Sequence, residues 1–180
     1  MVRGLARTAA LILLVSGCGG TPAESHNATD VMFLQMSVAQ IAEGDRVAQV
    51  VERRATGAEL RAVATELRAA WRAEEPMMRG WLQVWGQPTT TEPATTGPRA
   101  GPHAGHGDLH ALREEDFTAL SDAEVGEFDR TATALLLGSL HNAMVTIRMQ
   151  AAGGSYPQAV DLAGRMMESR QRQIARLLAV

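Results

Sequence analysis

TGAELRAVATELRAAW, residues 56–71, carries a helix start and a helix period within one short stretch. Thr56 followed by Glu59 is the pattern of a capping box, in which two side chains accept hydrogen bonds from backbone N–H groups of the first helical turn. Because the apolar residues that follow recur every three or four positions, they share one face of an α-helix. The stretch therefore predicts an amphipathic helix whose apolar face is Leu60, Val63, Ala64, Leu67 and Trp71.

Three further stretches have the same organisation. Start signals of this kind begin at Asn27, Ser121 and Ser155, and each precedes a run of helical periodicity. Pro157 falls near the first turn of the last run, where its missing N–H costs nothing. At 1.5 Å per residue the predicted helices are each roughly 35–45 Å long. They cover residues 28–53, 57–85, 122–151 and 156–179.

Glycine and proline residues indicate how these helices are joined. Gly153-Gly154 predicts a tight turn between the last two helices, and Gly86 with Pro88 predicts the end of the second. Pro76 falls inside the second helix and is expected to kink or split it. Long helices joined in pairs by short turns bury their apolar faces most simply as an antiparallel four-helix bundle. The predicted fold class is therefore all-α.

The segment between the two pairs has a different composition. Within a predicted domain at 27–180 we separate hairpins at 27–86 and 121–180 from a linker at 87–111. The linker is rich in Thr, Pro and Gly, so it is predicted to be a flexible crossover rather than part of the core. Residues 112–120 predict a short helix that leads into the third long one.

Composition limits the classes of function. Apolar residues make up 46% of the chain and aromatic residues only 4%, a palette of Ala, Leu, Val and Met that favours helices over strands. All 17 basic residues are Arg, and the formal net charge is −3. Basic and acidic residues are interspersed, so the chain has no basic stripe of the kind that binds nucleic acid.

The first 18 residues indicate export. The positively charged start MVRGLART precedes AALILLV, an apolar run too short to span a bilayer, which is typical of a secretory signal peptide. Val15-Ser16-Gly17-Cys18 resembles the bacterial lipobox, in which the cysteine is acylated, for example with palmitate, and becomes the mature N-terminus. An ordinary signal peptide with an incidental cysteine is the alternative.

Cys18 is the single cysteine, so the chain forms no intramolecular disulfide. Residues 19–26 then predict a flexible tether between the lipid and the bundle. In this interpretation the protein is lipid-anchored on the extracytoplasmic face of a bacterial cell membrane, and acyl chains provide its membrane affinity.

The two predicted hairpins repeat one another. Phe33 and Phe128 lie near the starts of their first helices, and a duplicated helical hairpin is the ferritin-like plan. The second helices carry matching patterns: Trp71-x2-Glu74-x3-Met78 and Arg170-x2-Gln173-x3-Leu177.

Three motifs from residue 26 onward are distinctive: His26-Asn27-x-x-Asp30-Val31-Met32-Phe33-x-Gln35-Met36, Met78-x2-Trp81-Leu82-x2-Trp85-Gly86 and Glu127-Phe128-Asp129-Arg130. They resemble motifs of the domain of unknown function 305 family. The resemblance implies a ferritin-like fold on a secreted or lipid-anchored protein. Some members of that family bind copper in the periplasm, and the family has no agreed enzymatic activity.

The chain departs from that family at the positions that the resemblance assigns to metal. The family carries an adjacent His-His pair in the first helix of each hairpin, where this chain has Gln40-Ile41 and Ser139-Leu140. His141 lies one residue past the second pair. That step rotates a helical side chain by about 100°, so His141 does not simply replace a lost ligand.

His141 is interpreted first as a packed bundle histidine that bonds a carbonyl or a neighbouring polar residue. The alternative is a ligand with Met36, Gln40, Asn142 or Met144 nearby, because one imidazole with thioethers suits a soft monovalent copper ion. Methionines at helical spacing are more often core residues.

Three further imidazoles, His103, His106 and His110, fall in the linker. Their spacing can chelate Cu(II), Zn(II) or Ni(II), but without a fixed backbone and supporting hydrogen bonds the affinity should be modest. They and His141, with Met36 and Met144, are the candidate metal ligands.

The sequence offers no catalytic residues. A ferritin-type di-iron centre requires Glu-x-x-His motifs, and no Glu in this chain has His three positions later. No Ser-His-acid set follows from spacing either. The sequence predicts a non-enzymatic cell-envelope lipoprotein of a copper-associated family, with a degenerate metal motif and residual binding of copper or another transition metal. The alternative is a scaffold or protein-interaction module without metal.

Overall fold

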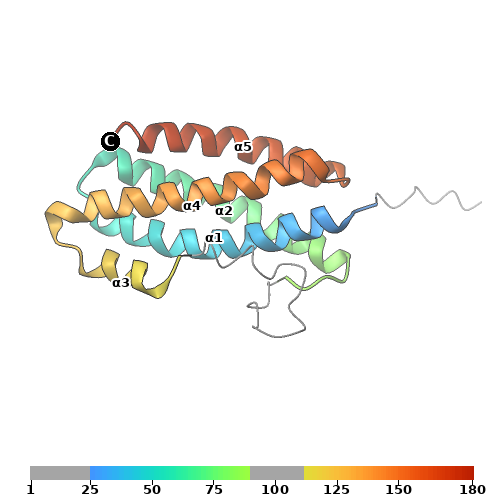
Figure 1. Ribbon diagram of the computed structural model, residues 1–180, viewed down its shortest axis with the longest axis horizontal. Coiled ribbons are helices and arrows are strands. Elements are labelled where there is room, and N and C mark those ends of the chain that lie inside the picture. The colour runs from blue at the N-terminus through green and yellow to red at the C-terminus, as the bar shows by residue number, and fades with distance from the viewer. Residues whose placement is uncertain (1–24, 90–111) are drawn as a thin grey trace, which may run out of the picture.

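The computed structural model describes residues 25–89 and 112–180, and within these ranges every regular element is a helix. Four long helices run antiparallel to their neighbours in a bundle, while a short helix lies outside it (Figure 1). The prediction of an all-α four-helix bundle is confirmed. Cys18, His103, His106 and His110 lie outside the described residues. The helices are α1 (Ala28–Arg54), α2 (Ala58–Val84), α3 (Glu114–Asp122), α4 (Val125–Gly153) and α5 (Pro157–Leu177).

Each predicted hairpin is present as a helix pair with a short turn. α1 packs on α2 and α4 packs on α5, while α1 against α4 and α2 against α5 join the two hairpins. Because α1 and α4 run in opposite directions, the start of each lies beside the turn of the other hairpin. The core between them is aliphatic, with a phenylalanine near the start of each first helix: Phe33 at 0% and Phe128 at 1% exposure.

The predictions made from Gly86 and Pro76 in α2 have different outcomes. Gly86 adopts a positive φ of 65°, and the backbone N–H of Gln87 donates to the carbonyl of Leu82 at 2.8 Å, a Schellman motif that ends α2 as predicted. Pro76, in contrast, does not split α2. It lies on the exposed side, where the carbonyl of Arg72 that loses its backbone donor can bond to solvent.

Of the four predicted capping boxes at the starts of the long helices, one is confirmed. Asn27 and Asp30 form the predicted capping box, with the Asn27 side chain accepting from the Asp30 N–H at 3.0 Å and the Asp30 carboxylate accepting from the Asn27 N–H at 2.8 Å. The other three long helices begin at residues with no side-chain cap of this kind: Gly57, Glu124 and Tyr156. The boxes predicted from Thr56, Ser121 and Ser155 are therefore wrong.

At two of these helix starts, carboxylates from the opposite hairpin accept hydrogen bonds from the backbone N–H groups. Asp129 of α4 accepts from the Gly57 N–H at 2.8 Å and from the Thr56 hydroxyl at 2.6 Å, at the start of α2. Asp30 of α1 accepts from the N–H groups of Ser155 and Tyr156 at 3.1 and 3.2 Å, at the start of α5. A tertiary contact has replaced the local cap, because a carboxylate satisfies orphan donors from wherever it comes.

Asp30 is completely buried and saturated with donors. It also accepts from Gln150 Nε2 at 2.5 Å and from the Ser155 hydroxyl at 3.0 Å. Burial acts to raise the pKa of Asp30, but the hydrogen bonds from Gln150 and from three backbone N–H groups together lower it below its ordinary value. The ionised form of Asp30 is thus a structural requirement at the junction of α1, α4 and α5.

Candidate functional site

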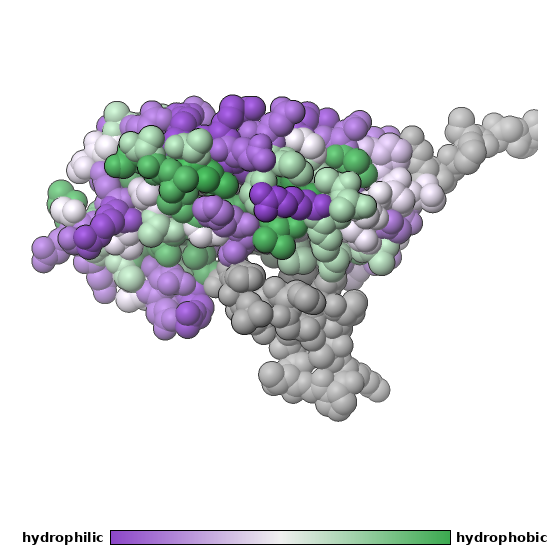
Figure 2. Space-filling view, turned by 45° about the horizontal axis from the view of Figure 1, so that its top comes forward, coloured by the Kyte–Doolittle hydropathy of each residue, from purple (hydrophilic) through white to green (hydrophobic). Residues whose placement is uncertain are grey.

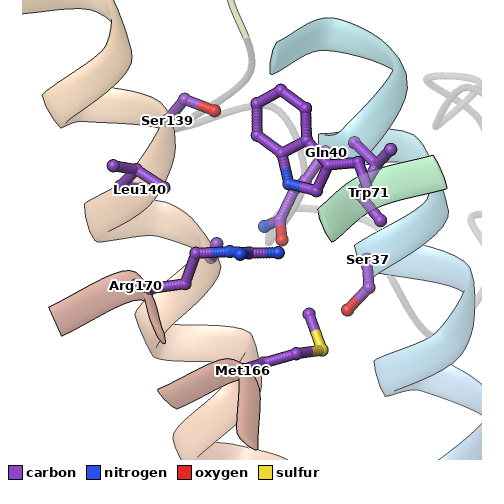
Figure 3. Close-up of a pocket in the computed structure, with 9 residues that line it drawn as sticks. Ser37, Gln40, Trp71, Ser139, Leu140, Met166 and Arg170 are labelled. Atoms are coloured by element: carbon purple, nitrogen blue, oxygen red, sulfur yellow. The ribbon is translucent and has the colours of Figure 1, made fainter. Parts of the chain in front are cut away.

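A small polar pocket lies in the middle of the bundle, where all four long helices meet (Figure 3). The space open to a water-sized sphere is about 10 Å³, on the order of one water molecule. Two of the buried polar atoms there, Ser37 Oγ and Gln40 Oε1, have no hydrogen-bond partner among the described residues. The pocket is lined by Ser37, Gln40, Ile41, Trp71, Ser139, Leu140, Ala143, Met166 and Arg170.

The pocket unites the four positions that the family resemblance sets against His-His pairs. Gln40 and Ile41 reach it from α1, and Ser139 and Leu140 reach it from α4. The sequence identified these positions separately on two helices, and the bundle brings them together at one point. Gln40 also links the two helices directly, because its Nε2 donates to Thr146 Oγ1 at 3.1 Å.

A buried guanidinium reaches into the same pocket. Arg170 extends from α5 toward the amide of Gln40 and the indole of Trp71 (Figure 3), with its Cζ 5.9 Å from the Trp71 ring centroid. Only 1% of Arg170 is exposed, and its guanidinium forms an ion pair with Glu74 of α2, which is 8% exposed. It also donates to Ser169 Oγ at 3.3 Å and to Gln173 Oε1 at 3.4 Å.

Burial sets the electrostatics of this pair. It raises the pKa of Glu74 above its ordinary value, while the charge and hydrogen bond of Arg170 pull the pKa back down. It also lowers the pKa of Arg170, although a guanidinium starts from so high a value that it stays protonated. Glu74 therefore depends on Arg170 to remain ionised in the bundle core, and Arg170 depends on Glu74 to compensate its buried charge.

These side chains do not suit a metal ion. Amide and hydroxyl oxygens are poor ligands for copper, which prefers imidazole and sulfur. Met166 supplies the one sulfur atom among the lining side chains, and a single thioether does not complete a copper site. The fixed positive charge of Arg170 would also repel a cation at short range in a low-dielectric interior. Among residues 25–89 and 112–180, no group of three or more His, Cys, Asp or Glu side chains converges to hold a metal. What the pocket can do chemically is accept one small polar molecule or remain a polar link between helices.

Of the ligands predicted in the described part of the chain, Gln40 lines this pocket, whereas His141, Met36 and Met144 do not. His141 lies exposed on α4, and its Nδ1 is 2.8 Å from the carbonyl oxygen of Leu137. The predicted bond to a carbonyl is present, but the prediction that His141 is packed in the bundle is wrong. Met144 is buried at 3% exposure and Met36 is half-buried. Neither methionine belongs to the pocket lining.

Sequence reasoning missed Glu74 and Arg170. Both occupy positions within the apolar stripes of their helices, since Glu74 follows Trp71 by three residues and precedes Met78 by four. A charged residue at a core position of a helix requires a partner, because an isolated buried charge is strongly disfavoured. This rule could have identified the pair from the sequence, because two core positions of opposite charge on two helices predict an ion pair.

The fold and the pocket define a bundle of two helical hairpins whose aliphatic core encloses one small pocket with polar side chains in its lining. A family model, Domain of unknown function (DUF305), matches residues 30–180, and the chain belongs to this family.

Solved structures share the fold. A DUF305 fragment from Deinococcus radiodurans aligns at a TM-score of 0.71 and 19% identity, covering 86% of this chain and 95% of that one. CopM in its Cu(II)-bound form aligns at 0.68 and 20% identity, covering 83% of this chain and 93% of CopM. CopM in its Cu(I)-bound form aligns at 0.66 and 17% identity, covering 85% and 95%. No curated protein sequence matches the chain significantly. None of the described helices is long and apolar enough to cross a membrane.

Proposed function

We propose that this chain is a non-enzymatic, extracytoplasmic lipoprotein of the DUF305 family whose bundle interior has exchanged metal ligands for a buried ion pair. The observation that carries the proposal is the pocket itself. Gln40 and Ser139 stand where the family resemblance places imidazoles, and the Arg170 guanidinium lies beside the amide of Gln40 (Figure 3).

Copper remains the metal that the family relationship favours. CopM, which shares this fold, has been solved with Cu(II) and with Cu(I). In this chain the imidazoles predicted as ligands are the ones available to a similar ion. His103, His106 and His110 form the primary candidate site because of their spacing, and His141 is a separate exposed imidazole on α4. Imidazole suits Cu(II) and Zn(II) at such a site.

A competition titration tests this division of roles. The chain is titrated with Cu(II), and with Cu(I) under reducing conditions, against a chelator of known affinity. Replacement of His103, His106 and His110 by Ala is expected to abolish saturable Cu(II) binding, whereas His141→Ala should leave it nearly unchanged. Binding that survives the triple replacement and is lost on Gln40→Ala would contradict the proposal, because the ion would then lie in the bundle.

The membrane anchor has its own test. Cys18→Ala is expected to move the protein from the membrane fraction to the soluble fraction of cells that produce it, because acyl chains provide the affinity. Retention of the Cys18→Ala variant in membranes would exclude lipidation at this cysteine as the anchor.

A scaffold without metal is the second candidate function. A specific feature favours it, namely the uncharged outer face of α4 that is described below. If neither oxidation state of copper binds with saturation, the scaffold alternative replaces the metal-binding one, while the assignment as an anchored, non-enzymatic bundle stays the same.

A further inference from the structure

The outer face of α4 is unlike that of the other long helices. Residues 131–147 contain no Asp, Glu or Arg, and the side chains that point away from the core in this span are uncharged. Val145 is 62% exposed there. On α5, in contrast, the exposed side chains include Asp161, Arg165, Glu168 and Arg172. Figure 2 shows hydrophobic residues gathered in a band across the face of the bundle that α4 and α5 form.

The outward residues of α4 follow a heptad spacing, with alternating steps of four and three. All are exposed except Thr131, which is half-buried. A strict seven-residue repeat keeps one stripe facing a partner helix over several turns, which is the geometry of a coiled coil. The stripe consists of Glu127, Thr131, Ala134, Gly138, His141, Val145 and Arg148.

The two ends of this stripe carry residues of opposite charge, and Glu127 at the first end also pairs with the exposed Arg130 of its own helix. Glu127 and Arg148 lie about 32 Å apart along the helix axis at 1.5 Å per residue, with Gly138 near the midpoint. If a second α4 lies antiparallel and is centred near Gly138, Glu127 of each copy falls beside Arg148 of the other. A parallel arrangement would place like charges together. The stripe is thus complementary to itself under a twofold axis, which is the usual symmetry of a homodimer.

We propose that the outer face of α4 binds the α4 of a second copy of this chain, antiparallel and centred near Gly138. The middle of the stripe permits close approach of the two helices. No atom lies within 4 Å of the position that a Cβ on Gly138 would take, and Ala134 and His141 then face each other across the seam. Burying the exposed Val145 side chain removes apolar surface from water.

The expected dimer is modest in strength. A single pair of helices buries less than the roughly 800 Å² per partner of a standard interface. Association therefore depends on concentration, and attachment of many copies to one surface would favour it by raising their effective concentration. The seam itself uses only residues of α4, so it does not depend on the proposed anchor or on metal binding.

Disulfide cross-linking in the full chain tests the proposal. Gly138→Cys is compared with Gly164→Cys, a matched control on α5, because both glycines are exposed and neither has an atom within 4 Å of its added Cβ. The unchanged chain, whose single cysteine is Cys18, gives the background. Under mild oxidation in membranes, Gly138→Cys is expected to form a covalent homodimer and Gly164→Cys is not.

Charge reversal in the Gly138→Cys background tests the orientation. Glu127→Arg or Arg148→Glu alone should reduce cross-linking by about fivefold, since each introduces two like-charged pairs. The double reversal should restore it. Equal cross-linking at the two glycines, a Gly138 cross-link to a different polypeptide, or a double reversal no better than the single ones would each overturn the proposal.

Discussion

Removing one partner of the buried ion pair should destabilise the bundle far more than removing both. Glu74→Leu leaves the Arg170 guanidinium charged, 1% exposed and without its carboxylate. Breaking a buried pair in this way costs about 3–5 kcal/mol, because the remaining charge is uncompensated. Gln173 and Ser169 offer Arg170 only long contacts of 3.4 and 3.3 Å, which cannot replace an ionised partner.

Arg170→Met should cost less than Glu74→Leu, because a carboxylate can escape its charge and a guanidinium cannot. Burial already raises the pKa of Glu74, and without Arg170 it would rise further. The unfolded pKa of this carboxyl group is near 4.5, and its folded pKa would be higher. The protonated group then makes its whole contribution to the free energy of unfolding below pH 4.5, and this contribution is lost as the pH rises through the folded pKa. The Arg170→Met variant is therefore expected to be more stable at pH 4.5 than at pH 7, by roughly 1–2 kcal/mol.

The double variant Glu74→Leu with Arg170→Met replaces the pair by apolar side chains of similar size. Its free energy of unfolding should lie within about 1 kcal/mol of the unchanged chain or exceed it, with little pH dependence. Urea denaturation followed by circular dichroism measures all four corners of this double-mutant cycle. If Glu74→Leu cost less than about 1 kcal/mol, or the double variant were less stable than either single one, the reasoning about buried charge would be refuted.

Three further predictions concern one helix junction and two glycines within helices. Asp30→Asn should cost about 2–4 kcal/mol of unfolding free energy, because the buried carboxylate accepts from several donors at the start of α5. We expect this cost to exceed that of Asp129→Asn, and the reverse order would contradict the reasoning. The folded pKa of Asp30 lies below 3.8, so the stability that its ionised carboxylate contributes is present above that pH and is lost as the pH falls through the folded pKa. Acid unfolding of the Asn variant should lack this loss of stability. Gly44→Ala places a Cβ 2.8 Å from the Trp71 ring and should cost about 1–3 kcal/mol in chemical denaturation. Gly164→Ala, with open space at its Cβ, should instead stabilise by about 0.5–1 kcal/mol.

Helices were predictable from the sequence because their signals are local. The apolar period fixed each long helix to within a few residues, and Gly86 fixed the end of α2. Start signals were less reliable, because Thr56 and Ser155 satisfy the pattern of a capping residue while their backbone N–H groups bond to carboxylates from the opposite hairpin. Local patterns do not contain the identity of a tertiary partner. The exposure of His141 was also out of reach, since an apolar run does not state which side faces the core.

The residues that line the pocket, however, can be related to one another through the internal repeat of the sequence. The repeat pairs Trp71 with Arg170 and Glu74 with Gln173, and the same offset pairs Gln40 with Ser139 and Asp30 with Asp129. In a bundle of two antiparallel hairpins related by an approximate twofold axis, equivalent residues near the axis must lie opposite one another. Trp71, Arg170, Gln40 and Ser139 do so in one pocket.

Equivalent residues far from that axis must lie at opposite ends of the bundle and act on the other hairpin, as the carboxylates of Asp30 and Asp129 do. The repeat therefore determines which positions form the site, while divergence between the two halves determines its chemistry. Because one half supplies Trp71 and Glu74 where the other supplies Arg170 and Gln173, the centre holds a cation–carboxylate pair. A symmetric duplication would place identical ligands there, and that difference argues that this interior does not hold a matched set of metal ligands.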